Sequence, residues 1–282
     1  MSLPRGVESS HPLGPKLKRL GLSGMLATLE VRAAEASREQ LRPTEFLALL
    51  VDDELDRREQ NRLRLRLREA GREEGKTLAR FDFSAVPALN GSLVLELATC
   101  AFLERRENLL ICGPTGVGKS HLLAGLAFEA IKRGHRVLLR PIHRVLQELH
   151  AGRADGSFAR RLAKLGAVDW LILDDFGLRA LPPQAIDDLY EIITQRYERR
   201  SLGLSSNRAL EEWPEVFGSS LLASAALDRL THHATTLIIT GRSYRQRDRR
   251  KEGEGPGRAS AGLDAAAGPA PTAAPATPAH QS

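Results

Sequence analysis

A glycine-rich loop between an apolar run and a helical stretch constrains this chain more than any other segment. The loop, Gly113-Pro114-Thr115-Gly116-Val117-Gly118-Lys119-Ser120, fits the pattern G-x-x-x-x-G-K-[ST]. Apolar residues 109–112 precede it, and His121 follows it at the start of a helical pattern. A strand, loop and helix in this order gather backbone N–H groups and a helix N-terminus around one point, which suits a phosphate group. This chemistry predicts that Lys119 contacts phosphates and that the Ser120 hydroxyl ligates Mg²⁺.

A second apolar run ends in two acids, as the strand beside a phosphate site should. Residues 170–173 are apolar and lead into Asp174 and Asp175. Asp174 is predicted to hold Mg²⁺, and Asp175 to polarise the attacking water as a general base. A strand-end turn is the alternative for such a pair. A third run, 202–206, ends at Asn207, whose amide could orient the same water or cap the helix that follows.

Short apolar runs and amphipathic stretches alternate from about residue 81 to residue 240. Strands are expected at 108–112, 136–140, 170–173, 202–206 and 236–240, and helices at 119–133, 142–150, 157–165, 183–199 and 220–230. This alternation predicts an α/β fold with a parallel central sheet and helices on both of its faces. Gly203 lies inside one predicted strand and is expected to weaken it.

The residues before this region have the periodicity of helices. Leucines at helical spacing predict a helix from Pro15 to about residue 37, interrupted near Gly21 or Gly24, and a second helix that begins near Pro43 with Thr44 as its N-cap. Arginine and leucine alternate over 62–68, which is a strand signal, but good helix formers surround them and favour helix. These arginines either face DNA or pair with nearby acids. The expected divisions are a flexible leader (1–15), a helical N-terminal domain (16–75), the α/β domain (76–250) and a disordered Pro/Ala/Gly-rich tail (251–282).

Composition excludes several classes of protein. No run approaches the roughly 18 apolar residues of a membrane helix, and the first 25 residues lack the apolar core of a secretory signal, so a cytoplasmic location is expected. Two cysteines cannot build a disulfide scaffold, and Cys112 is expected in the core. No metal is expected at His232 and His233, because adjacent histidines normally point to different faces and no third ligand lies nearby in the sequence.

The charge balance is basic, with 41 Lys and Arg against 35 Asp and Glu, for a net charge of +6. The segment Arg242–Lys251 alone carries six basic residues and one acid. Arginine-rich clusters attract polyanions, nucleic acid first, although a solvated tail explains the composition equally well.

The order of these motifs resembles that of the IstB-like ATP-binding proteins. The resemblance covers about residues 16–250. It is carried by the phosphate loop, LILDDFG at 171–177, SSNR at 205–208, ALDRLTHHA at 226–234 and SYR at 243–245. Members of this family are helper ATPases encoded beside the transposase of certain bacterial insertion sequences, related to DnaC-type helicase loaders within the AAA+ class of P-loop NTPases.

The resemblance implies roles for further residues. ATP and Mg²⁺ would bind at residues 113–121, with Asp174 and Asp175 as the Walker B pair and Asn207 as sensor 1. Arg229 would be the arginine finger offered to a neighbouring subunit, although the residues alone allow a surface ion pair, and Arg245 would be the sensor 2 arginine. Many AAA+ proteins have Asp-Glu where this chain has Asp-Asp, so hydrolysis is expected to be slow and stimulated by assembly or DNA.

The resemblance also implies a function and partners. The expected protein is a homo-oligomeric, ATP-dependent DNA-binding ATPase that assembles on target duplex DNA and assists an IstA-like transposase, with no membrane partner. A DnaC-like helicase loader acting on single-stranded DNA is the alternative, and the pattern at 16–70 favours the transposition helper. A third possibility is a binding module that assembles with ATP and scarcely hydrolyses it.

Phe81 and Phe83 could pack near the adenine or simply belong to the core.

Overall fold

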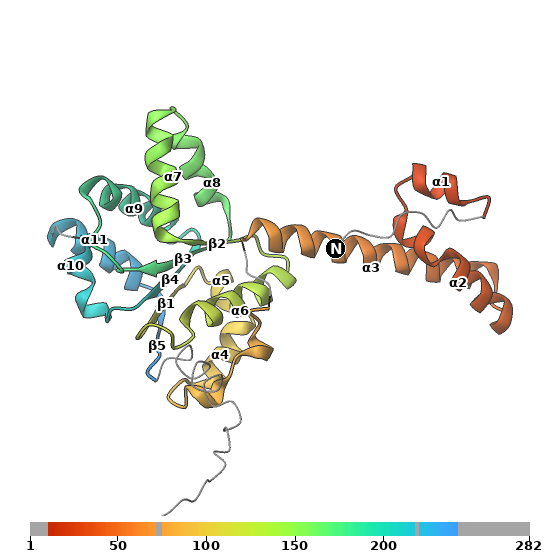
Figure 1. Cartoon of the computed structure of the whole chain (residues 1–282), viewed down its shortest axis with the longest axis horizontal. Coiled ribbons are helices and arrows are strands. Elements are labelled where there is room, and N and C mark those ends of the chain that lie inside the picture. The colour runs from red at the N-terminus through yellow and green to blue at the C-terminus, as the bar shows by residue number, and fades with distance from the viewer. Residues whose placement is uncertain (1–10, 72–74, 218–219, 242–282) are drawn as a thin grey trace, which may run out of the picture. The chain divides into compact units, whose positions relative to one another are not determined.

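The structure is a computed structural model that describes residues 11–71, 75–217 and 220–241. Three helices form its N-terminal part. These are α1 (Gly14–Arg19), α2 (Ser23–Glu39) and α3 (Pro43–Glu69) (Figure 1). The interruption expected near Gly21 is confirmed and spans residues 20–22, whereas Gly24 lies inside α2. The alternating segment 62–68 is helical, as predicted.

The start of α3 corrects the expected cap. The N-cap is Arg42, and Pro43 occupies the first turn, where its missing N–H is not needed. The Glu45 carboxylate accepts the Arg42 backbone N–H at 2.8 Å and also binds the Arg42 guanidinium. Thr44 therefore lies within the first turn and caps nothing.

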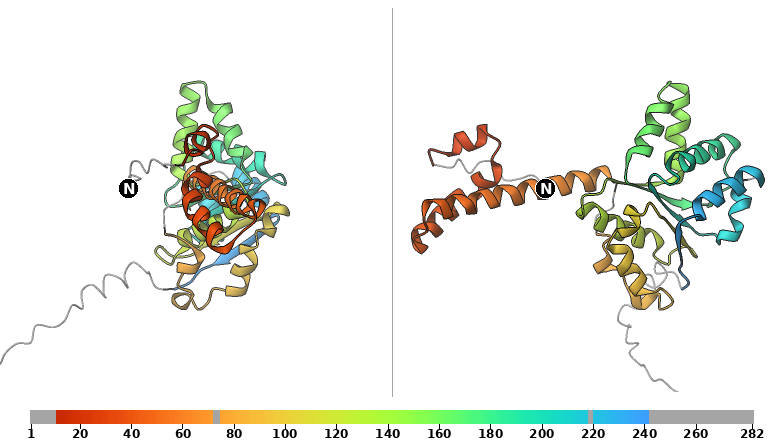
Figure 2. Two further views of the ribbon diagram at one scale, coloured as in Figure 1. Left: turned by 90° about the vertical axis from the view of Figure 1, so that its right-hand side faces the viewer. Right: turned by 180° about the vertical axis from the view of Figure 1, so that it is seen from behind.

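Close contacts join α2 to α3, and Figure 2 shows this pair from two further sides. The Gly24 N–H donates to the Glu54 carboxylate at 2.6 Å. Glu54 is only 4% exposed, and its carboxylate also binds Arg58. A Cβ at Gly24 would lie 2.6 Å from the Asp53 carbonyl oxygen, so the helices can approach this closely only at a glycine. Arg32 binds both oxygens of the Asp53 carboxylate, at 2.8 and 2.9 Å.

The α/β part is built on a sheet of five parallel strands in the order β2-β3-β4-β1-β5. The strands are β1 (Asn108–Cys112), β2 (Val137–Pro141), β3 (Trp170–Phe176), β4 (Ser201–Ser206) and β5 (Ala234–Ile238). The larger helices are α4 (Gly91–Ala98), α6 (Lys119–Lys132), α7 (Ile142–Ala154), α8 (Phe158–Ala167), α9 (Pro183–Arg196) and α11 (Ser220–Thr231). The short ones are α5 (Ala101–Glu104), α10 (Trp213–Phe217), η1 (Leu78–Arg80), η2 (Phe83–Ala85) and η3 (Leu210–Glu212).

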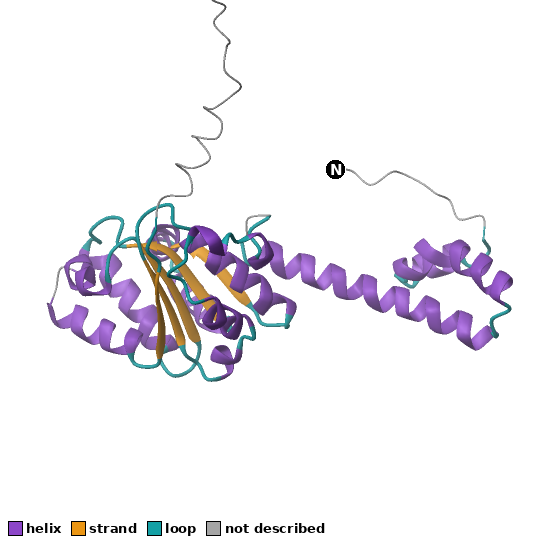
Figure 3. Cartoon of the chain, turned by 90° about the horizontal axis from the view of Figure 1, so that it is seen from below, coloured by secondary structure: helices purple, strands orange, loops and turns teal. Residues whose placement is uncertain are grey.

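Helices cover both faces of this sheet, as predicted, and Figure 3 shows the strands enclosed between them. The residues of β1 alternate between two apolar cores. Leu109 and Ile111 pack with α4 and α6, whereas Leu110 and Cys112 pack with α7, α9 and α11. Because a strand points successive side chains to opposite faces, this alternation places one helical layer on each side.

Gly203 has a packing role that its strand position did not suggest. A Cβ there would lie 2.8 Å from the Trp170 indole Nε1, so the missing side chain makes room for the buried Trp170 ring on the neighbouring strand. Both cysteines are buried, and burial raises the pKa of each thiol to about 11. Among the described residues, no helix combines the length and the apolar content that crossing a membrane requires. The expected tail, 251–282, and the segment Arg242–Lys251 lie outside the described residues.

Candidate functional site

The glycine-rich loop joins β1 to α6 and owes its shape to glycines at three positions. Gly113, Gly116 and Gly118 have φ values of 151°, 86° and 100°, a region that residues with a side chain rarely enter. A Cβ on Gly113 would also lie 2.1 Å from the Ile239 carbonyl oxygen. The loop therefore wraps tightly at the end of β1 and leads directly into the first turn of α6.

Lys119 is the first residue of α6 and is only 8% exposed. Its ammonium group donates to the carbonyl oxygens of Gly113 and Pro114, at 2.7 and 2.8 Å. Burial lowers the pKa of Lys119, while the nearby Asp174 and Asp175 carboxylates oppose that shift. The cation thus lies folded over the loop, where an anionic ligand would compete with the two carbonyl groups.

Asp174 meets two hydroxyl groups at the carboxyl end of β3. The Ser120 hydroxyl donates to Asp174 Oδ1 at 3.1 Å, and the Ser205 hydroxyl donates to the same oxygen. Ser205 also accepts the backbone N–H of Asp175 at 3.0 Å. Ser120 and Asp174 are the two predicted Mg²⁺ ligands, whereas no sequence motif points to Ser205, which contacts both acids from the adjacent strand β4.

Asp175 and Asn207 lie at neighbouring strand ends and are exposed. Asp175 has a φ of 65°, and the pairing of β3 with β4 shifts register between Leu173 and Phe176. Asn207 follows β4 and lines, with Gly113 and Pro114, a cavity of about 250 Å³ beside the loop. Asn207 is not the cap of the following helical turn, because η3 begins after Ala209.

A cluster of aromatic rings contacts the loop at Gly118. The Phe81 ring packs edge-on against the rings of Phe83 and His121, with centroids 4.9 and 5.5 Å away. A Cβ on Gly118 would lie 3.0 Å from Phe81. The ring of His121 is also hydrogen-bonded to the Thr77 carbonyl oxygen at 3.0 Å. Phe81 thus belongs to the core and contacts the loop, so the two interpretations offered for it are compatible.

Arg229 lies at the opposite end of β1 from the loop. The Asn108 side chain, at the start of β1, donates to the Leu230 carbonyl oxygen at 3.0 Å beside Arg229. The strand has five residues, so its ends are about 13 Å apart. Arg229 donates to the hydroxyls of Tyr190 and Thr194 on α9. Within the described ranges Arg229 has these hydroxyl partners and no surface ion pair with an acid. Arg245 lies outside the described residues.

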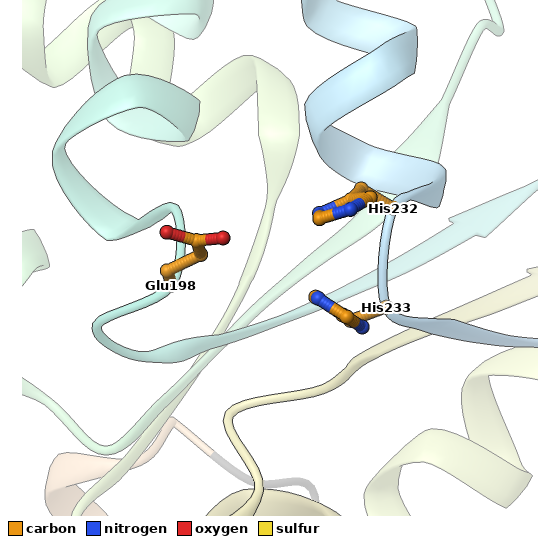
Figure 4. Close-up of side chains that lie close together, drawn as sticks. All are labelled: Glu198, His232 and His233. Carbon is orange, nitrogen blue, oxygen red and sulfur yellow. The ribbon is translucent and has the colours of Figure 1, made fainter.

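His232 and His233 correct the expectation that adjacent histidines point apart. Their rings lie 4.0 Å apart between centroids, because His233 has a φ of 88° where the chain turns from α11 into β5 (Figure 4). Glu198 joins them, with one ligand atom from each residue within 4.8 Å of the others, and all three residues are exposed. The Tyr197 hydroxyl is hydrogen-bonded to His232 Nδ1 at 2.9 Å. This group has side-chain types that bind zinc.

Comparison with known proteins identifies the family. A family model described as "IstB-like ATP binding protein" matches residues 15–252. The chain belongs to this family. An ATP-binding protein of insertion sequence IS21 from Pseudomonas aeruginosa is 37% identical to the IstB-like chain over 243 residues, which are 86% of this chain and 92% of that protein. An insertion-sequence ATP-binding protein of Mycobacterium tuberculosis is 39% identical over 234 residues, or 83% and 93% of the two chains.

A solved structure shows the same fold as the IstB-like chain. The replication initiator DnaA, bound to AMPPCP and single-stranded DNA, matches with a TM-score of 0.50 and 24% identity over 64% of this chain and 56% of DnaA. The parallel sheet and the loop after β1 show a P-loop NTPase-like fold, and the family match identifies an ATP-binding protein.

Proposed function

We propose that the IstB-like chain hydrolyses ATP as a homo-oligomer assembled on duplex DNA and thereby assists a transposase. The observation that carries the proposal is the placement of Arg229 at the far end of β1 from the phosphate loop. No side chain spans about 13 Å, so Arg229 can reach a nucleotide only in another subunit. A finger of this kind couples hydrolysis to assembly, because it completes the neutralisation of the transferring phosphoryl group.

Residues of one subunit would hold ATP and Mg²⁺. The Ser120 hydroxyl and the Asp174 carboxylate place two oxygen atoms 3.1 Å apart beside the loop, and oxygen donors are the ligands that Mg²⁺ prefers. Bound there, Mg²⁺ would neutralise charge on the β- and γ-phosphates. Lys119 would exchange its two loop carbonyls for phosphate oxygens. Asp175 and Asn207, both exposed at adjacent strand ends, would orient the attacking water.

Two further residues belong to the proposed site. The family resemblance assigns Arg245 to the nucleotide as sensor 2. Phe81 would contact the base, because it packs against Gly118 and His121 at the entrance to α6.

The C-terminal half of α3 would contact the DNA backbone. Arg62, Arg64 and Arg68 are exposed there, and within the described part of the chain none of them forms an ion pair. Arginine contacts to phosphates give affinity without strong sequence preference. The segment Arg242–Lys251 would add phosphate contacts by its charge alone.

The insertion-sequence relatives support the transposition helper over the helicase loader. The Pseudomonas and Mycobacterium relatives, which match over most of their own length, are both named as ATP-binding proteins of insertion sequences. A transposase is the partner that such a context supplies. The loader alternative predicts preference for single strands, so the substrate of assembly separates the two functions.

The test measures assembly by light scattering, and DNA binding by fluorescence anisotropy, on duplex and single-stranded DNA of equal length with ATP, ADP or no nucleotide. We expect assemblies that form with ATP on duplex DNA in preference to single-stranded DNA and that do not form with Lys119→Ala. The affinity for DNA should fall steeply as the salt concentration rises. Replacing both Arg62 and Arg64 by Ala should lower the slope of log affinity against log salt by about one per lost contact. Arg38→Ala removes a charge already paired with Glu39 and serves as the control. Preference for single strands would replace the proposal with the loader, and binding indifferent to nucleotide would refute ATP control.

Turnover tests the enzymatic part of the proposal. Lys119→Ala should abolish ATP hydrolysis, and Arg229→Ala should abolish its stimulation by assembly, because the finger stabilises charge that develops only in the transition state. Wild-type turnover no higher than that of Lys119→Ala would favour the binding module that scarcely hydrolyses ATP.

A further inference from the structure

A cavity of about 340 Å³ opens at the Arg229 end of the sheet. Its charged lining consists of Arg105, Arg106, Arg229, His232, His233 and Glu198. Arg229 lies in the last turn of α11, and the other five come from the turn before β1, the turn after α9 and the turn between α11 and β5. The cavity is therefore assembled from three turns and the end of α11, at the amino end of β1 and opposite the phosphate loop.

Unusual backbone conformations concentrate in this cavity. Arg106, Glu198 and His233 have φ values of 59°, 55° and 88°. They are three of the six described non-glycine residues with positive φ, and another of the six is Asp175 at the proposed catalytic site. Such conformations cost energy and persist where the surrounding structure enforces them, commonly at functional sites.

Hydrogen bonds hold the turns and their side chains together. The Arg106 guanidinium donates to the Glu198 carbonyl oxygen at 3.0 Å, which links the turn before β1 to the turn after α9. Tyr197 engages Nδ1 of His232, so Nε2 is the ring nitrogen that remains to face a ligand. Arg229 is held by Tyr190, and its guanidinium also lies over the Tyr190 ring, 5.0 Å from the centroid. The basic groups are thus positioned before any ligand arrives.

The charge of the lining favours an anion over a metal ion. Glu107 engages the Arg105 guanidinium through both carboxylate oxygens, at 2.6 and 2.9 Å. Arg106 and Arg229 remain as cations with neutral hydrogen-bond partners, and Glu198 is the one carboxylate in the lining. A divalent cation bound by Glu198 and the histidines would be repelled by both guanidinium groups. Phosphate oxygens match such groups in charge and geometry.

We infer that this cavity receives the phosphate groups of ATP bound to a neighbouring subunit, and that Arg106 and His232 contact them beside Arg229. The inference rests on the proposed action of Arg229 between subunits and extends it to two residues that the sequence motifs left unassigned. Arg106 supplies a second guanidinium. His232 supplies a hydrogen bond from Nε2, oriented by Tyr197.

Subunit mixing tests this assignment. Arg106→Ala and His232→Ala should each lower ATP turnover about tenfold or more, as expected for loss of a transition-state donor, and should leave ATP affinity at their own phosphate loops unchanged. Mixing either variant with Lys119→Ala should restore turnover, because the variant supplies an intact loop and the Lys119→Ala subunit supplies an intact cavity. Arg133→Ala, an exposed arginine on the turn after α6, is the matched control and should keep turnover within about twofold.

The outcomes separate this inference from the proposed function. Wild-type turnover in Arg106→Ala and His232→Ala would overturn the inference. The inference would also be overturned if mixing with Lys119→Ala restored the turnover of Arg229→Ala but not that of Arg106→Ala and His232→Ala. That pattern would indicate damage within one subunit. If mixing with Lys119→Ala did not restore the turnover of Arg229→Ala, the proposed action of Arg229 between subunits would be refuted. The inference would then fall as well, because it rests on that action. Stoichiometric Zn²⁺ binding by calorimetry that disappears in both Glu198→Gln and His232→Ala would reassign the cavity to a metal.

Discussion

Replacing Ser205 by Ala should weaken both folding and Mg²⁺-dependent ATP binding. The Ser205 hydroxyl is fully buried on β4, donates to Asp174 Oδ1 and accepts the Asp175 N–H at 3.0 Å. The substitution removes one donor to a carboxylate and one acceptor for a backbone N–H on the adjacent strand. Asp174 keeps the Ser120 hydroxyl as a partner.

The size of the effect follows from these contacts. Removing one partner of a buried polar group costs about 1–3 kcal/mol, and the charged carboxylate places this case in the upper half of that range. We therefore expect the free energy of unfolding to fall by about 2 kcal/mol. If half of that loss applies to the positioning of Asp174, the Mg²⁺ concentration for half-maximal ATP binding should rise about fivefold.

Urea denaturation measures the first quantity, and titration of Mg²⁺ at fixed fluorescent ATP analogue measures the second. Ser201→Ala is the matched control. Ser201 lies on the same strand and is equally buried, but its hydroxyl has no hydrogen-bond partner among the described residues, so its loss should cost little. Ser205→Thr keeps the hydroxyl and should retain most of the Mg²⁺ response. The reasoning is refuted if Ser205→Ala and Ser201→Ala behave alike in both assays.

Three further predictions concern other parts of the chain. Gly24→Ala should destabilise the helical pair by about 1–3 kcal/mol in thermal unfolding, because the new Cβ would collide with the backbone of α3. The Arg32 guanidinium lowers the pKa of Asp53 to about 2. This ion pair should therefore stabilise the helical pair above about pH 4 and lose its effect as the pH falls through 2. Asp53→Asn should remove that pH dependence of the free energy of unfolding. Cys100 and Cys112 should resist thiol reagents at pH 8 until the protein is unfolded, because both are buried with pKa values of about 11.

Each of these predictions has a defined contrary result. Gly91 lies at the start of α4, where a Cβ would meet no neighbouring atom, so Gly91→Ala should leave the stability unchanged. Equal effects of Gly24→Ala and Gly91→Ala on thermal unfolding would refute the steric argument. An unchanged acid profile in Asp53→Asn would mean that Arg32 does not set the pKa. Rapid labelling of either native cysteine would show that its surroundings open readily.

The parts of the fold that depend on local sequence were predictable. Apolar runs, glycines and the acids after 170–173 specified the strands, the loop and the position of Asp174 without long-range information. Ser205 was not predictable, because a serine in an apolar strand gives no sign of what its hydroxyl meets. Its role depends on the register of β4 with β1 and β3, which places Ser205 opposite Ile111 and near the shift between Leu173 and Phe176.

The histidine pair shows a second limit of sequence reasoning. Periodicity rules assign faces within a helix or a strand, but His232 and His233 lie between the two, where one residue of positive φ turns both rings together. Glu198 comes from a turn 34 positions earlier in the sequence, so only the fold makes it a neighbour. Thr44 failed as a cap for a simpler reason: Pro43 can start the helix two residues earlier than a cap at Thr44 would.

The two ends of β1 give each subunit a direction. Its carboxyl end carries the loop proposed to hold ATP, and its amino end is tied through Asn108 to α11, beside the arginine proposed to act on the next subunit. Contacts made in this way are head-to-tail, and repeating them produces a row with two unlike ends. At one end of the row, the bound ATP receives no Arg229 from a neighbouring subunit. At the other end, Arg229 has no neighbouring ATP to contact. Growth and loss of subunits should therefore proceed at different rates from the two ends of such a row.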